Sequence, residues 1–309
     1  MKTINLKQSL QSTVLITAAL GCIVSAPQAA QAGQQHGGWT YAIDSFNDGT
    51  EGRVIGDKSA FEFYGLAYRE YEDTVVFAFN SNLDLNGYSD RRARGGNIGY
   101  GDLFLNFGSG NFSQADGTGD LYAVNFANND SKVAQGLYRN VTTQSLTTQN
   151  SGYSSIKQHT QTVASYKGTA SHGDLAANDG YFDQNKAART NIKRGDYASS
   201  IAMLDSFEDL DFGHFGASGK KTFGFSINKS SLPLGDFVAN FFAECGNDGI
   251  AIKGELTGKV ATIPGSNDTK AVPESSSTAG LLVIGMMAGT AALRKRRQAA
   301  AVVAAQVAA

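Results

Sequence analysis

The stretch "GDFVANFFAECGNDGIAIKGEL", residues 235–256, contains two segments of alternating apolar and small or polar residues on either side of a turn sequence. Alternation with a period of two is typical of a β-strand, because successive side chains point to opposite faces of the sheet. We therefore expect strands over 235–244 and 249–256. Residues 245–248, "CGND", contain the Gly, Asn and Asp typical of tight turns, which makes the pair a predicted hairpin.

The same pattern recurs on the N-terminal side of this hairpin. Further strands are predicted over residues 39–46, 61–69, 74–80, 101–107, 120–126 and 221–228. The second and third are separated only by "EYED", which indicates another hairpin. Short strands without intervening helical repeats predict an all-β fold, an antiparallel β-sandwich or jelly-roll, over residues 33–260.

The middle of the chain, from residue 128 to about 200, is rich in Ser, Thr and Gln. We expect a long polar excursion between strands there, with one short helix around residues 154–166. Long loops of this kind are functional or mobile.

The first 32 residues have the three parts of a secretory signal peptide. Two lysines precede an apolar stretch, and Ala30 and Ala32 form a small-x-small cleavage site that would leave Gly33 as the first residue. The competing interpretation is a lipoprotein signal, in which residues 19–22 form a lipobox and Cys22 would be lipidated. After cleavage at Ala32, Cys245 would be the one remaining cysteine, and its apolar neighbours predict burial.

The C-terminus has a linker over 261–271, then a motif, a short apolar span over 279–293 and a basic cluster. Fifteen helical residues reach about 22 Å, less than the roughly 30 Å of a hydrocarbon core. The basic cluster would stay cytoplasmic and leave the domain outside. An alanine-rich extension over 299–309, for which we have no physical role, ends the chain. The motif consists of Val272, Pro273 and Glu274, and the cluster of Arg294, Lys295, Arg296 and Arg297.

This order resembles the PEP-CTERM sorting tag of exosortase-dependent bacterial surface proteins, here over residues 272–298. Ser275 stands where that family has its second proline. The resemblance implies transient membrane insertion, cleavage near the motif by an exosortase-type membrane protease, and removal of the span. A plain single-pass anchor is the alternative. The domain is also similar, in 39–50, 96–107 and 210–256, to exosortase-dependent surface proteins without assigned biochemistry.

Charge argues against nucleic acid as a partner. The formal net charge is −2, but six of the 26 basic residues lie in the predicted signal peptide or the basic cluster, so the domain between them is more acidic. Binding to nucleic acid relies on cationic contacts to phosphate.

No enzyme motif is complete. Residues 213–222 are similar to a P-loop but have the wrong residues at its required positions, and the four histidines lack the spacing of a zinc site. Asn82, Asp84 and Asn86 alternate as calcium ligands do, but Ala93 replaces the glutamate that such a loop needs, which predicts weak calcium binding or none. "NDG" occurs at 47–49, 178–180 and 247–249; turn chemistry explains each, although clustered carboxylates could hold calcium.

These observations predict an exported protein without a cofactor or enzymatic activity, located at the cell envelope, the outer surface or outside the cell. Its expected role is structural or adhesive. The expected partners are the export machinery, the exosortase-type protease and, as a further candidate, exopolysaccharide. The alternatives are a secreted carbohydrate-active enzyme, which would need paired acids, and a calcium-dependent glycan-binding module.

Overall fold

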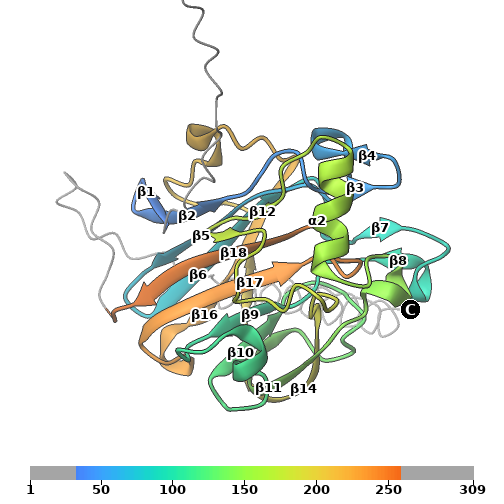
Figure 1. Ribbon diagram of the computed structural model, residues 1–309. Helices are drawn as coiled ribbons and strands as arrows, with labels where there is room; N and C mark the ends of the chain where they lie inside the picture. Colours follow the sequence, from blue (N-terminus) through green and yellow to red (C-terminus); the bar gives the residue numbers. More distant parts are fainter. Residues whose placement is uncertain (1–32, 259–309) are drawn as a thin grey trace, which may run out of the picture.

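The computed structural model describes residues 33–258, in which two six-stranded antiparallel sheets form the body of the protein (Figure 1). The first sheet has the order β1-β2-β5-β6-β16-β15 and the second β14-β11-β10-β9-β17-β18. The first contains Gln34–His36, Trp39–Ile43, Phe63–Glu70, Thr74–Ser81, Lys221–Asn228 and Ala202–Leu204, in that spatial order. The second contains Asn191–Ser199, Gly136–Gln144, Leu121–Asn125, Leu103–Asn106, Gly235–Phe242 and Gly249–Leu256. The predicted all-β class with antiparallel sheets is confirmed.

Aromatic residues from both sheets form one shared core. Phe79 of β6 packs against Phe223 of β16 with ring centroids 5.2 Å apart, and against Phe241 of β17 in the other sheet at 5.1 Å. Phe126, just after β10, stacks on Phe79 at 4.9 Å. Burying large aromatic surfaces is the main stabilising contribution available to such a chain, and it explains why phenylalanine recurs along these strands.

The outer faces of both sheets are also covered, which changes the sequence pattern. In β6, Phe77 and Phe79 lie in the shared core, whereas Val76 and Ala78 belong to a second cluster on the outer face with Trp39 and Phe212. The other sheet has a similar outer cluster, to which α2 (Ile156–Ser165) contributes Ile156. Strands buried on both faces alternate between large and small side chains rather than between apolar and polar ones.

The two predicted hairpins are confirmed. β17 and β18 pair from Gly235↔Leu256 to Phe242↔Gly249, so the turn comprises residues 243–248. β5 and β6 pair up to Glu70↔Val75. Cys245, in the first of these turns, is fully buried and free, as its surroundings predicted.

The middle segment is the part of the fold that the prediction had wrong. The predicted helix is present as α2, with the side chain of Ser155 capping its first turn. However, β11 and β14, which were expected to be part of a loop, pair with each other in the second sheet, where β14 is the edge strand and β11 lies between it and β10. Threonine is β-branched and suits a strand, but in these strands the alternation of burial is broken by irregular pairing near residues 139–143. The true excursion is therefore residues 145–190, and Figure 1 shows α2 in front of β17 and β18.

Smaller elements complete the described chain. They are three two-stranded ribbons, the helix α1 and short 3-10 turns. The ribbons are β3 with β4 (Thr50–Glu51, Val54–Ile55), β7 with β8 (Tyr88–Ser89, Asn97–Ile98) and β12 with β13 (Ser171–His172, Leu175–Ala176); α1 is Phe112–Ala115. Within residues 33–258, no helix is long and apolar enough to cross a membrane. The predicted signal peptide, the sorting motif, the span over 279–293 and the basic cluster lie outside the described residues.

Candidate functional site

A surface depression lies where β10, β11 and β14 meet the segment that follows β16. Its volume is about 490 Å³, and its walls include two tyrosines, one arginine and two serines. The residues that matter for its chemistry are Tyr122, Arg139, Tyr197, Ser230 and Ser231.

The two side chains from β11 and β14, Arg139 and Tyr197, lie where the pairing of these strands is irregular. The register between β11 and β14 shifts at three places between Leu137 and Thr143, and Asn140 has a φ of 53°. Such β-bulges bend an edge strand and redirect its side chains. Tyr197 is 54% exposed, and its ring meets the ring of Tyr138 edge-on at 5.6 Å. Tyr122 is held in the same way by Phe107 at 5.6 Å.

The side chains that line the depression combine aromatic surfaces with hydrogen-bonding groups. A tyrosine ring presents an apolar face and a hydroxyl, and a guanidinium and serine hydroxyls provide hydrogen-bonding groups around it. Among the residues that line it there is no carboxylate. The depression therefore suits a ligand that combines apolar C–H faces with many hydroxyls or with negative charge.

The alternating residues proposed as calcium ligands have separate partners. The amide of Asn82 donates to the carbonyl oxygens of Asp57 and Ser59, at 3.0 and 2.9 Å. Asp84 forms an ion pair with Lys221 at 2.7 Å, and the hydrogen bond from this lysine lowers the pKa of the Asp84 carboxyl. The backbone N–H of Asn86 donates to Asp84 Oδ1 at 3.0 Å. Weak or absent calcium binding at this loop stays a prediction.

Of the other predicted site residues, Gly33 alone lies in the described chain. Its N–H donates to Oδ2 of Asp174 at 3.2 Å, and burial raises the pKa of this carboxyl to about 6. Ala30, Ala32, Val272, Pro273, Glu274 and Arg294–Arg297 lie outside the described residues.

The structure also joins histidines that are far apart in the sequence. The rings of His36 and His214 stack with centroids 3.7 Å apart, and ligand atoms of both lie within 4.8 Å of one another and of Asp211. All three residues are at least partly exposed. Spacing along the chain could not reveal this group, because β1 and the turn around His214 meet only through the fold.

The fold and this depression define an all-β protein with an aromatic and polar surface site and no acidic residue in its lining. No family model, curated protein or solved structure matches the chain. The function must therefore be argued from the residues themselves.

Proposed function

We propose that this chain is an exported envelope or matrix protein with a structural or adhesive role, and that it adheres to polysaccharide through the depression at Tyr122, Arg139 and Tyr197. Its two sheets would serve as a sandwich or jelly-roll scaffold that displays this surface. The sequence signals at both ends supply the argument for export and for processing by an exosortase-type protease.

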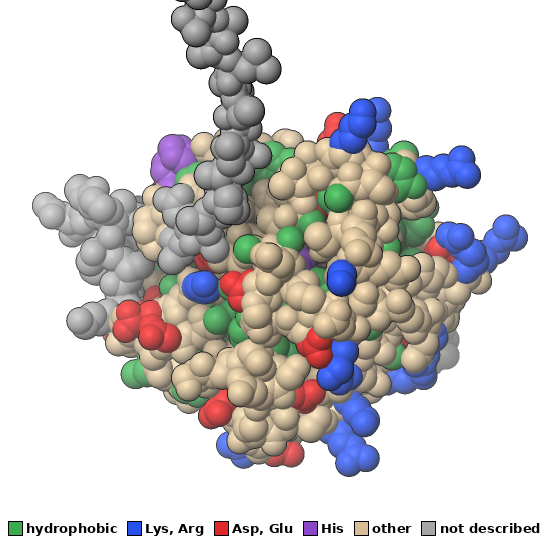
Figure 2. Space-filling model, in the orientation of Figure 1, with side chains coloured by type: hydrophobic (Ala, Val, Ile, Leu, Met, Phe, Trp, Pro, Cys, Tyr) green, Lys and Arg blue, Asp and Glu red, His purple; other side chains and the backbone are tan. Residues whose placement is uncertain are grey.

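The exposed Tyr197 is the observation that carries the adhesive role. Tyr197 is 54% exposed, so part of its aromatic surface is available for a ligand to pack on. The C–H face of a sugar ring can pack on this ring, while the Arg139 guanidinium and the Ser230 and Ser231 hydroxyls bind sugar hydroxyls or carboxylates. On the face of the protein seen in Figure 2, Lys and Arg lie mainly along the right and lower edges, and Asp and Glu are scattered over the same face. That distribution also favours a glycan over nucleic acid.

The enzyme alternative has less support. Hydrolysis of a glycosidic bond needs two carboxyl groups on opposite sides of the bond. The lining of the depression has none, and the carboxylates that do cluster, described below, are buried away from any polymer.

Binding can be tested with purified protein comprising residues 33–258 by affinity electrophoresis in gels that contain dextran, alginate or hyaluronan. We expect retardation by at least one polymer, and loss of retardation in Tyr197→Ala. Tyr166→Ala is the matched control, because Tyr166 is also exposed, at 41%, but lies at the end of α2. Equal migration of the wild type and Tyr197→Ala in all gels would refute binding at the depression.

Processing is tested separately, by the intact mass of the protein from the envelope and the medium. We expect a mature C-terminus near Pro273 or Glu274 and loss of residues 279–293. Quantitative retention of these residues would instead indicate a plain membrane anchor. Replacing Arg294–Arg297 with serine should reduce correct processing, because basic residues set the orientation of a span.

A further inference from the structure

Four acidic side chains meet in the interior, at the end of the molecule where the β17–β18 turn packs on the loop after β2. We call Asp44, Asp48, Glu62 and Asp248 the acidic cluster. One carboxylate oxygen from each of the three aspartates lies within 4.8 Å of the others. All four residues are buried, with exposed fractions between 0 and 6%. Asp48 and Asp248 come from two of the three "NDG" sequences, which lie 200 residues apart.

Main-chain hydrogen bonds hold each carboxylate in place. The N–H of Ser171 donates to Asp48 Oδ2 at 2.7 Å, and the N–H of Gly49 donates to Glu62 Oε2 at 2.8 Å. Asp44 Oδ1 accepts the N–H of Gly173 at 2.9 Å and also the Ser171 hydroxyl.

Asp248 is held through both of its oxygens. Its Oδ2 accepts the N–H of Phe63 at 2.7 Å, and its Oδ1 accepts the N–H of Gly249 at the same distance. The acidic cluster thus connects the first strands, the excursion and the last hairpin.

The opposite oxygens of three of these groups have no partner. They are Asp44 Oδ2, Asp48 Oδ1 and Glu62 Oε1, and all are buried. Two other buried acids, Asp102 and Glu244, differ. Asp102 accepts from Asn125 and Asn129 on one oxygen and from the N–H of Ile192 on the other, and both oxygens of Glu244 are also partnered. A buried polar atom without a partner is costly, so three in one place point to a ligand.

The charge of the acidic cluster is not balanced by side chains. The four ion pairs found within residues 33–258 all involve other acids. Two buried histidines contact the same loops, His159 through the carbonyl oxygen of Asp48 at 2.9 Å and His172 through that of Gly249 at 3.0 Å. Burial lowers the pKa of both imidazoles to about 4, so they are neutral at pH 7.

Burial and the uncompensated negative charge raise the pKa values of the carboxyl groups. Burial raises the pKa of Asp44 to about 7, and burial together with the charge of Asp44 raises that of Glu62 to about 8. The pKa values of Asp48 and Asp248 are also raised, first by burial and then by repulsion within the acidic cluster. Without a bound cation, the acidic cluster must take up protons near neutral pH.

We propose that the acidic cluster binds a calcium ion, with Asp44, Asp48 and Asp248 as ligands and Glu62 as a fourth carboxylate beside them. Calcium prefers oxygen ligands, and its ligand shell can be supplied largely by protein oxygens. Magnesium keeps several waters, and the deep burial of these carboxylates disfavours such a hydration shell. Zinc sites are built mainly from His and Cys, and the ligand atoms that come together here belong to three aspartates, with no histidine or cysteine among them.

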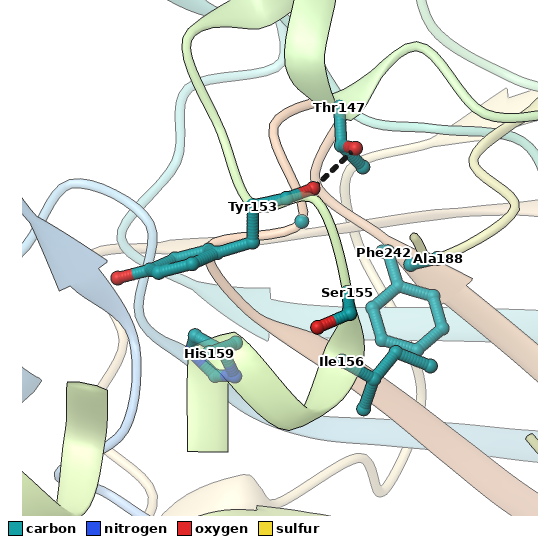
Figure 3. A pocket seen from close by; sticks show the side chains of 8 residues that line it. Thr147, Tyr153, Ser155, Ile156, His159, Ala188 and Phe242 are labelled. Carbon is teal, nitrogen blue, oxygen red and sulfur yellow. Dashed lines mark hydrogen bonds between the residues drawn. The ribbon is translucent and has the colours of Figure 1, made fainter. Parts of the chain in front are cut away.

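The small hollow next to the acidic cluster is not an alternative ligand-binding site. Figure 3 shows it between Tyr153, His159 and Phe242, and its volume is only about 10 Å³, too small for an organic ligand. The ion would be structural: it would tie the excursion at Ser171–His172 to both sheets. This inference does not depend on the proposed function.

The test is calcium titration by calorimetry of the chelated protein comprising residues 33–258, with thermal melts in EDTA and in 10 mM CaCl₂. We expect one site per chain and a rise in Tm of roughly 5–10 °C at saturation. Asp48→Asn should abolish both effects and still fold in EDTA, because it removes a buried charge and keeps an oxygen for Ser171.

Two matched controls locate the site. Asp102→Asn changes a buried carboxyl outside the acidic cluster, and Asp84→Ala changes the loop singled out by sequence; both should retain the calcium shift. No heat and no change in Tm in wild-type protein would overturn the proposal and indicate protonated carboxyls instead. A shift that persists in Asp48→Asn, or that disappears in Asp84→Ala, would place the ion elsewhere and overturn it equally.

Discussion

Raising the pH from 6.5 to 8 should destabilise the calcium-free protein. Asp44 and Glu62 have pKa values raised to about 7 and about 8 in the folded state, above their ordinary values of 3.8 and 4.5. The folded state therefore binds more protons than the unfolded state in this pH range, and stability falls as pH rises. Asp102, with its pKa raised to about 7, adds a contribution of the same sign.

The magnitude follows from the number of protons involved. Each group that is protonated only in the folded state costs about 1.4 kcal/mol of stability per pH unit. Glu62 contributes over most of the interval and Asp44 over its lower part, so together they account for a loss of about 2 kcal/mol. That corresponds to a decrease in Tm of roughly 4–8 °C for a domain of this size. The two buried histidines act in the opposite direction, because their imidazoles are neutral in the folded state but lose their remaining protons above pH 6.5 in the unfolded state. Each adds only about 0.4 kcal/mol of stability over this interval, which the contribution of Asp102 roughly offsets.

The assay is a series of thermal melts in EDTA at pH 6.5, 7, 7.5 and 8, for the wild type and Glu62→Gln. We expect a smaller decrease in Tm for Glu62→Gln, because its amide does not titrate. Saturating calcium should reverse the trend, since a cation binds deprotonated carboxylates better. A Tm that stays constant or rises with pH in EDTA would refute the assigned burial and charge of the acidic cluster.

Further predictions concern the core, the thiol and the N-terminus. Phe79→Ala should cost about 3–5 kcal/mol in the free energy of unfolding measured with urea, because Phe79 is fully buried among rings of both sheets; a loss below about 1 kcal/mol would contradict this packing. Cys245 should resist thiol reagents in the native protein and react after denaturation, because burial raises its pKa; rapid native labelling would contradict its placement. If the signal peptide is cleaved after Ala32, the new ammonium group of Gly33 should pair with Asp174, so Asp174→Asn should lower the Tm of the cleaved protein more than that of a form with extra N-terminal residues. Equal shifts in both forms would argue against this ion pair.

The sequence pattern was sufficient to predict those elements whose formation depends on residues close together in the chain. The strands predicted over 221–228 and 249–256 have the observed bounds, and the two hairpins pair as expected. Alternating side chains and turn residues act over a few positions, so they can be read from the chain itself. The helix α2 is similar: Ser155 caps it, and its buried positions, Ile156, His159 and Val163, recur at helical spacing.

Strands that depend on distant partners were missed. β11 and β14 carry many polar residues, and their pairing joins segments about 50 residues apart. A polar strand gains its backbone hydrogen bonds only when the sheet supplies a neighbour, so its own sequence favours a loop equally well. The burial of the outer faces of both sheets could not be predicted for the same reason. The alternation between large and small residues in β5 and β6 does not indicate which segments pack on either face of these strands.

The sequence by itself determined the β class, the hairpins, the burial of Cys245 and the expectation that "NDG" sequences form turns. It also offered Asn82, Asp84 and Asn86 as calcium ligands, because ligand spacing within one loop is all that a single chain can display. Only the tertiary structure decided which turns meet. Asp48 and Asp248 lie 200 positions apart, and β18 must pack beside β2 and β5 before their carboxylates share one buried space. Electrostatic repulsion and loss of water arise from that proximity, which is why neither the acidic cluster nor its raised pKa values can be read from the order of residues.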